Sequence, residues 1–165
     1  MNIIDSPSPN FDDRPEGQVV DMVIIHAMAL PLDEALAILQ KPCPEGKYEV
    51  SAHYLIDHDG TIYRLVNEEK RAFHAGISEW DGRQNLNYCS IGIELLNKDV
   101  NGGEAFNVPF EELQIEALET LLNTMKTRHP IKDDYILGHD QIAPSRKNDP
   151  GPHFPWHKFR KTAIS

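Results

Sequence analysis

The sequence predicts a single α/β domain in which helices flank a central mixed β-sheet. A continuous apolar run at residues 19–27 indicates a buried strand, and a long amphipathic pattern at residues 111–129 indicates a helix. Predicted strands and helices alternate along the chain, which is typical of α/β folds. The length of 165 residues suits one domain with one core.

The first predicted elements follow a Pro- and Asp-rich lead-in at residues 1–18, which we expect to be irregular, so the domain itself is expected at residues 19–165. The run at 19–27 is rich in β-branched residues and contains no Gly or Pro, as is typical of an interior strand. A short helix is expected at 32–40, because acidic residues occupy its first turn. The segment 51–66 predicts a β-hairpin, since two β-rich runs flank an Asp-Gly pair that favours a tight turn.

The second half of the chain adds a strand, a long helix and a last strand. Residues 88–97, "YCSIGIELLN", predict another strand, and a polar loop with two glycines follows it. The helix at 111–129 has apolar residues at helical spacing and must end before Pro130. Residues 134–139 predict a last short strand, after which we expect a loop and a short helix from Trp156.

Composition excludes several classes of function. The net charge is −10 and no Lys/Arg cluster occurs, so nucleic acids and anionic membranes are poor partners. No apolar run approaches the roughly 18–20 residues that span a bilayer. The N-terminal stretch has no basic segment followed by an apolar one, so we expect a cytoplasmic location, with export to the periplasm left open. We also expect a monomer. Cys43 and Cys89 are far apart, which excludes a disulfide framework and disfavours a thiolate zinc site.

Two histidines stand at the ends of predicted strands. His26 closes the first strand and His139 closes the last, where an unpartnered imidazole is costly to bury. Asp149 follows His139 on a proline-rich loop, and two imidazoles with one carboxylate form a ligand set that suits a catalytic zinc ion. The spacing permits many paths for the loop, so hydrogen-bonded structural histidines remain the alternative at this point.

Five motifs in a fixed order carry a resemblance to a known family. They are "VIIHAM", "SAHYLI", "FHAGIS", "SIGIEL" and "GHDQIAPSRKNDPGPHFPW", and they extend from about Val19 to Phe159. Together they resemble the zinc-dependent N-acetylmuramoyl-L-alanine amidases of the amidase-2 family, whose fold is shared with peptidoglycan recognition proteins. The match is nearer to the AmiD/AmpD-like branch than to the phage enzymes.

The resemblance implies one Zn²⁺ ion per chain and a role for each matching residue. The implied metal ligands are His26, His139 and Asp149. Glu94 matches the general base that acts on the zinc-bound water, and Lys147 matches the lysine that stabilises the oxyanion. Ala52 stands where the phage members have a tyrosine, which leaves Glu94 as the candidate base.

The implied substrate is the amide between the lactyl group of N-acetylmuramic acid and L-alanine, in peptidoglycan or in anhydro-muropeptides during cell-wall turnover or recycling. Stem peptides carry carboxylates, so basic residues near the site are candidate contacts. The predicted substrate-binding residues are Arg146, His74, His53, Trp80, Arg64 and Arg71. Two alternatives stay open: a peptidoglycan-binding module without catalysis, and a zinc hydrolase that acts on another amide.

Overall fold

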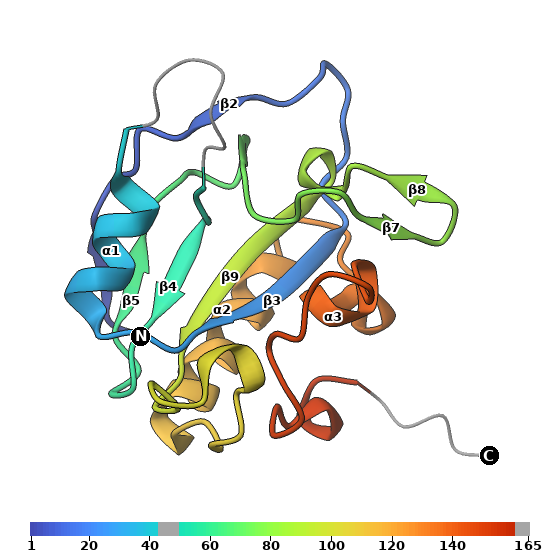
Figure 1. The fold of residues 1–165 in the computed structure, drawn as a ribbon. Coiled ribbons are helices and arrows are strands. Elements are labelled where there is room, and N and C mark those ends of the chain that lie inside the picture. The colour runs from blue at the N-terminus through green and yellow to red at the C-terminus, as the bar shows by residue number, and fades with distance from the viewer. Residues whose placement is uncertain (43–49, 161–165) are drawn as a thin grey trace.

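The computed structural model describes residues 1–42 and 50–160 (Figure 1). Its central sheet contains, in spatial order, β1 (Ile3–Asp5), β5 (Ile62–Arg64), β4 (Tyr54–Ile56), β9 (Ser90–Leu96), β3 (Met22–Met28) and β10 (Ile136–Gly138). The β4–β5 pair is antiparallel and the other neighbours are parallel, so the predicted mixed sheet is confirmed. Cys89 is a buried free cysteine, whereas Cys43 lies outside the described residues.

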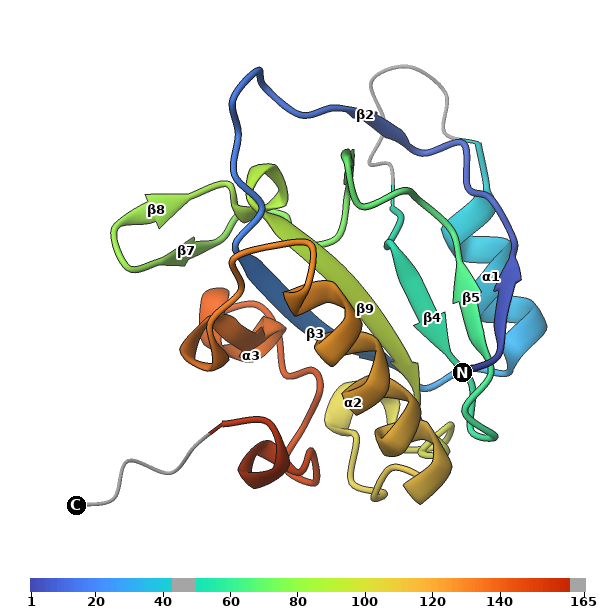
Figure 2. The same cartoon turned by 180° about the vertical axis from the view of Figure 1, so that it is seen from behind.

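Helices cover both faces of this sheet, as predicted. The helix α1 (Leu32–Gln40) lies on one face beside β4 and β5, and α2 (Glu112–Lys126) lies on the opposite face, nearest the viewer in Figure 2. The short helix α3 (His139–Ile142) directly follows β10. None of the helices in the described residues combines the length and apolar character needed to cross a membrane.

Side chains of β3 and β9 point alternately to the two faces of the sheet, so the core and the candidate site lie on opposite faces. Val23 and Ile25 of β3 pack in the same core as Ile93 of β9 and the apolar face of α2. Successive residues of a strand point to opposite faces, so His26 and Glu94 project from the face opposite α2. The two are direct partners in the register of β3 and β9. The face toward α2 is thus an apolar core, and the opposite face carries the polar His26 and Glu94 between two smaller hydrophobic clusters.

Smaller elements complete the fold around the sheet. The additional strands form two antiparallel pairs, β2 (Phe11–Asp13) with β6 (Lys70–Ala72) and β7 (Glu79–Trp80) with β8 (Arg83–Gln84). Short 3₁₀ helices occur at η1 (Leu86–Tyr88), η2 (Gly103–Ala105), η3 (Asp133–Tyr135) and η4 (Trp156–Lys158). The last of these agrees with the short helix expected from Trp156.

Two predictions require correction. The lead-in is not irregular throughout, because it contributes β1 to the edge of the central sheet and β2 to a second pair. Its polar residues also bond to later segments: the Ser8 hydroxyl donates to the Leu39 carbonyl at 2.6 Å. The last strand ends at Gly138, so His139 begins α3 instead of closing a strand. The Gln141 side-chain oxygen accepts the Gly138 N–H at 2.9 Å and stabilises this change of direction.

Candidate metal centre and active site

The site is built at the carboxyl end of the two longest strands. His26 stands near the end of β3, and Glu94 stands beside it near the end of β9. His139 reaches the same place from the first turn of α3, and the loop after α3 returns Asp149 to it. The Asp140 N–H donates to the Asp149 carbonyl at 2.9 Å, which fixes that return. Ligands of α/β proteins commonly bind beyond the carboxyl ends of the strands.

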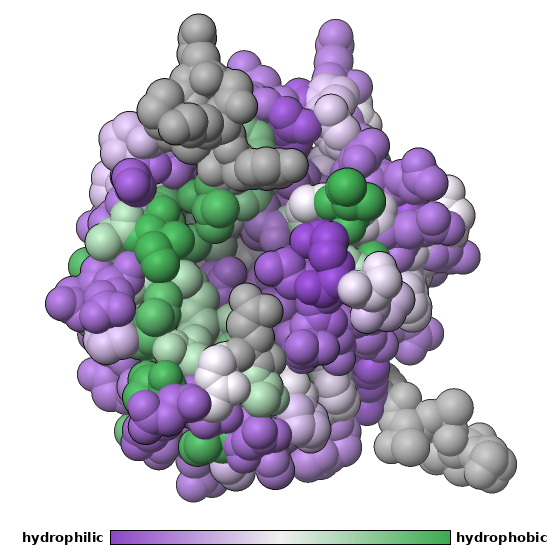
Figure 3. Space-filling model, in the orientation of Figure 1, coloured by the Kyte–Doolittle hydropathy of each residue, from purple (hydrophilic) through white to green (hydrophobic). Residues whose placement is uncertain are grey.

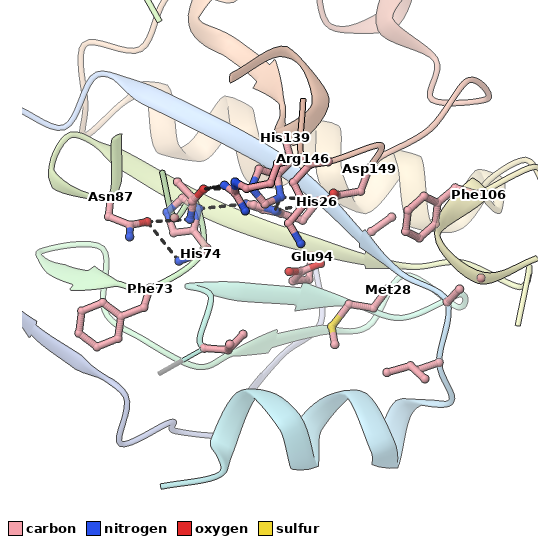
Figure 4. A pocket seen from close by; sticks show the side chains of 18 of the residues that line it. His26, Met28, Phe73, His74, Asn87, Glu94, Phe106, His139, Arg146 and Asp149 are labelled. Atoms are coloured by element: carbon pink, nitrogen blue, oxygen red, sulfur yellow. Dashed lines mark hydrogen bonds and ion pairs between the residues drawn. The ribbon is translucent and has the colours of Figure 1, made fainter. Parts of the chain in front are cut away.

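Three ligand atoms converge at this place (Figure 4). The Nδ1 atoms of His26 and His139 lie 3.0 Å apart, and each lies 3.2 Å from Oδ2 of Asp149. Tetrahedral zinc with ligand bonds of about 2.0–2.1 Å separates its ligand atoms by about 3.3 Å. The triangle formed by the three side chains therefore has nearly the dimensions of one face of a zinc tetrahedron.

Hydrogen bonds on the far side of each ring fix which nitrogens face the centre. Nε2 of His139 lies 3.0 Å from the Ala75 carbonyl, which can only accept, so this nitrogen carries the hydrogen. Nε2 of His26 lies 2.9 Å from Nδ1 of His74. Burial, reinforced by the neighbouring His139, lowers the pKa of His26 to about 4, so this ring is a neutral ligand.

This arrangement favours a cation. When the hydrogens of His26 and His139 lie on Nε2, the bare Nδ1 lone pairs of both rings face each other and the Asp149 carboxylate. Three such electron-rich atoms at 3.0–3.2 Å repel one another unless a positive ion lies between them. The donor set and its geometry therefore fit a divalent metal of the zinc type.

Glu94 is a buried carboxyl group beside the three ligand atoms. Its residue is 9% exposed, and no group in the described parts of the chain donates a hydrogen bond to its Oε2. Burial raises the pKa of Glu94 well above its ordinary value, Asp149 raises it further, and Lys147 opposes the shift. A buried carboxyl group with a free oxygen atom can accept a proton and release it again.

These residues form the floor of a pocket of about 880 Å³. One wall is apolar and includes Met28, Leu30, Val50 and Phe73. The opposite wall includes Arg146 and Lys147. Figure 3 shows the hollow with hydrophobic residues along one side and hydrophilic residues along the other. The pocket therefore suits a ligand with one apolar and one anionic side.

The predicted substrate contacts divide between the pocket and the rest of the molecule. Arg146 and His74 line the pocket, although His74 is only 8% exposed and lies beside His26. Nη2 of Arg146 donates to the Ala75 and Ile77 carbonyls at 2.9 and 2.8 Å, so part of this guanidinium supports the neighbouring loop.

The other four predicted contacts are corrected. His53 is fully buried, with Nδ1 accepting the Gly92 N–H at 3.0 Å, so it has no surface to offer a substrate. Arg64 and Arg71 lie outside the pocket lining, because carboxylates of the lead-in pair with them, Asp5 in the first case and Asp12 in the second. Trp80 also lies outside it, on β7 of the small hairpin.

Several residues that shape the pocket were not predicted from the sequence. Phe73 and Met28 line the apolar wall, and Asn87 lines the side nearest the His74 loop. The Oδ1 atom of Asn87 accepts the backbone N–H groups of His74 and Ala75 at 3.1 and 2.8 Å. Phe73 directly precedes His74 in a quoted motif and could have been found there, whereas Asn87 stands between Leu86 and Tyr88, outside every quoted motif, and gives no local signal.

Comparisons with known proteins agree with this geometry. A family described as N-acetylmuramoyl-L-alanine amidase, Amidase_2, matches residues 16–152. The chain is 35% identical to the 1,6-anhydro-N-acetylmuramyl-L-alanine amidase AmpD of Citrobacter freundii over 93% of this chain and 86% of that protein. It is 37% identical to the N-acetylmuramoyl-L-alanine amidase AmiD of Escherichia coli K12 over 98% of this chain, which spans only 61% of AmiD.

Two solved structures show the same fold. A crystal structure of AmpD superimposes with a TM-score of 0.80 at 34% identity and covers 96% of this chain and 91% of that chain. The complex of E. coli AmiD with the substrate anhydro-N-acetylmuramic acid-L-Ala-D-gamma-Glu-L-Lys gives a TM-score of 0.74 at 38% identity, over 88% of this chain and 59% of that chain. The predicted resemblance to AmiD- and AmpD-like amidases is confirmed.

Proposed function

This chain belongs to the family of N-acetylmuramoyl-L-alanine amidases, and we propose that it uses one zinc ion to cleave the amide between the lactyl group of N-acetylmuramic acid and L-alanine. One observation carries the proposal. The ligand atoms of His26, His139 and Asp149 converge at 3.0–3.2 Å beside the unpartnered carboxyl group of Glu94.

The metal would be held by His26, His139 and Asp149, which all line the pocket. When bound, zinc supplies Lewis acidity, which lowers the pKa of a water molecule to about 7 and polarises a carbonyl group. The surrounding protein orients the ligands, because the other nitrogen of each imidazole is held by the loop that contains His74 and Ala75.

Glu94 is proposed as the general base and then the general acid. Its carboxylate accepts the proton that the attacking water loses, and it returns a proton to the nitrogen of the departing L-alanine. Burial raises the pKa of Glu94 above its ordinary value, which strengthens this carboxylate as a proton acceptor. The unpartnered Oε2 leaves a free acceptor for the water.

Lys147 is proposed to stabilise the transition state. It lines the pocket on the same wall as Arg146 and within the electrostatic reach of Glu94. Its ammonium group would stabilise the negative charge that develops on the carbonyl oxygen of the substrate. Because the charge is absent from the ground state, this interaction favours turnover more than binding.

An anhydro-muropeptide is the proposed substrate, and recycling of cell-wall fragments is the proposed role. AmpD is named as a 1,6-anhydro-N-acetylmuramyl-L-alanine amidase, and the AmiD complex contains an anhydro-muramyl tripeptide. A pocket of about 880 Å³ with one apolar and one basic wall suits a ligand with an apolar portion and a carboxylate-bearing peptide. The cytoplasmic location and the monomeric state stay predictions.

The test is a hydrolysis assay on the purified full chain loaded with zinc. Anhydro-muropeptide and intact peptidoglycan sacculi are incubated separately, with and without EDTA, and products are identified by mass spectrometry. We expect a free peptide that begins with L-alanine, faster from the anhydro-muropeptide and absent with EDTA. Binding without cleavage by a zinc-loaded chain would indicate a peptidoglycan-binding module, and cleavage at another bond would indicate a different zinc hydrolase.

A further inference from the structure

The short segment His74–Ala75 contacts both metal histidines on the side away from the centre. The Ala75 carbonyl accepts the Nε2 hydrogen of His139, and the His74 ring lies 2.9 Å from Nε2 of His26. His74 was predicted from the sequence to contact the substrate. Its burial and its position behind His26 give it a different task.

The direction of the hydrogen bonds that His74 makes follows from Ser90, which lies beside the ring nitrogen that faces away from His26. Ser90 donates its hydroxyl hydrogen to the Leu86 carbonyl at 2.6 Å, so its oxygen can only accept from the His74 Nε2 atom 3.3 Å away. Nε2 of His74 therefore carries a hydrogen. No carboxylate in the described parts of the chain contacts the buried ring, so the ring is neutral and its Nδ1 is bare.

The bare Nδ1 of His74 completes the sequence of donors and acceptors. It accepts the hydrogen from Nε2 of His26, which leaves Nδ1 of His26 without a hydrogen and facing Asp149 and His139. If Ser90 donated to His74 instead, the hydrogen bonds from Ser90 to His74 and from His74 to His26 would both run in the opposite direction. Nδ1 of His26 would then carry a hydrogen and could not bind a metal. The Leu86 carbonyl therefore selects the tautomer that can bind a metal.

The place of the His74 ring is reserved by a glycine. A methyl group at Gly92 of β9 would lie 2.4 Å from the His74 ring, closer than any real contact. Gly92 thus has a steric role at a position where the backbone is ordinary strand. Asn87 holds the backbone on the other side, since its Oδ1 accepts the N–H groups of His74 and Ala75.

We propose that His74 is a positioning residue that, with Ser90 behind it and Gly92 beneath it, fixes the tautomer and orientation of the metal ligand His26. The proposal rests on the proposed zinc site. Metal-ligating histidines whose outer nitrogen loses its partner bind metal on the order of 10–100-fold more weakly. His74 is expected to act in this way, and not as a contact to substrate.

The test compares two replacements of similar shape in the full chain. In His74→Asn the side-chain oxygen can occupy the place of Nδ1 and accept from His26, whereas His74→Leu has no acceptor. Zinc dissociation constants are measured by competition with a chromophoric chelator, and Co²⁺ absorption spectra report the geometry of the centre. We expect His74→Leu to bind zinc on the order of 10–100-fold more weakly and His74→Asn to stay within a few-fold of the unaltered chain.

Two further variants separate positioning from general damage. Gly92→Ala leaves His74 in the sequence but displaces its ring, so zinc affinity should fall as in His74→Leu. Gln114→Ala removes a fully buried polar side chain of α2, on the other face of the sheet, that donates to the Ile56 and Leu96 carbonyls, so stability should fall while zinc affinity is kept. If the unaltered chain binds no zinc, the proposed function fails and this proposal with it. If it binds zinc and His74→Leu binds equally well, only the positioning role is overturned.

Discussion

Two glutamates of this protein expose equally little of their surface and have opposite hydrogen-bond environments. Glu68 and Glu94 are each 9% exposed. Glu68 accepts hydrogen bonds from the Tyr54 hydroxyl at 2.7 Å and from Arg128 and His129 at 2.6 Å each. Glu94, by contrast, has an oxygen to which no described residue donates.

The difference in partners reverses the effect of burial on the pKa. Burial alone would raise the pKa of Glu68, but the hydrogen bonds from Arg128, Tyr54 and His129 outweigh it and lower the value. For Glu94 burial is the dominant cause and the pKa rises well above the ordinary value. Glu68 is a carboxylate satisfied by its neighbours, and Glu94 is a carboxyl group left free for chemistry. The predictions below test this contrast between the Glu68 cluster and the metal centre.

The largest effect on zinc binding and hydrolysis is expected from Asp149→Ala, which removes one of the three proposed metal ligands beside Glu94. Two imidazoles without the carboxylate form an incomplete ligand set, so we expect no zinc after dialysis and hydrolysis at background level. Metal content measured by mass spectrometry checks this result. Asp140→Asn is the matched control, because Asp140 is a nearby partly buried carboxyl group outside the ligand triangle. Stoichiometric zinc in Asp149→Ala would refute the ligand assignment.

Glu94→Gln is expected to separate metal binding from turnover. The amide keeps the shape of the side chain but cannot take up the proton of the attacking water, so turnover should fall by about 10²–10⁴-fold. Zinc content should be unchanged, and the free energy of unfolding should not fall, because no donor loses its acceptor. Steady-state rates at equal zinc content make the comparison. Loss of zinc would show that Glu94 supports the metal instead of the proton transfer.

Lys147→Met should reduce turnover on the order of 10²–10³-fold, the usual cost of losing one group that stabilises an oxyanion. The Michaelis constant should change less than the turnover number, because the charge develops only in the transition state. Lys132→Met offers a control, since Lys132 is exposed and lies outside the pocket lining. Unchanged turnover in Lys147→Met would remove the lysine from the mechanism.

Glu68→Gln is expected to affect stability and not catalysis. Replacing the carboxylate weakens the hydrogen bonds from Tyr54, Arg128 and His129, so the free energy of unfolding should fall by about 1–3 kcal/mol. Turnover should remain within a few-fold of the unaltered chain. Urea titrations and the hydrolysis assay measure the two quantities. A large loss of turnover at full folding would mean that the two regions are coupled.

The smallest effect is the pH dependence of that stability difference. The pKa of Glu68 is lower in the folded state, so the folded chain binds fewer protons at this group than the unfolded chain. The stabilisation is therefore fully present above the ordinary glutamate pKa of about 4.3 and is lost as the pH falls through the folded value. The difference between the unaltered chain and Glu68→Gln should therefore shrink as the pH falls below about 4. A difference that grows on acidification would contradict the lowered pKa.

Sequence patterns predicted the main elements because those patterns are local. The strand at 19–27, the helix at 32–40 and the helix at 111–129 each bury a face whose period is visible in the sequence, and the structure has β3, α1 and α2 there. The strands β1 and β2 were missed because they are three exposed residues each and exist through pairing with distant segments.

The metal ligands of the site were easier to predict from the sequence than its substrate contacts. The resemblance placed His26, His139 and Asp149 together, which spacing alone could not do. Arg64 and Arg71 were misjudged because their carboxylate partners lie 59 residues away in sequence, where no local pattern reveals the pairing. A basic residue without an acidic neighbour in the sequence can therefore still be paired in the fold, and it is then not available to bind a substrate.

The most direct measurement compares hydrolysis of anhydro-muropeptide by three zinc-loaded proteins at equal folded concentration: the unaltered chain, Glu94→Gln and Glu68→Gln. The release of peptide that begins with L-alanine is followed by mass spectrometry over time. We predict comparable release by the unaltered chain and Glu68→Gln and almost none by Glu94→Gln. Release by Glu94→Gln at the rate of the unaltered chain would contradict the assignment of the unpartnered carboxyl group to catalysis.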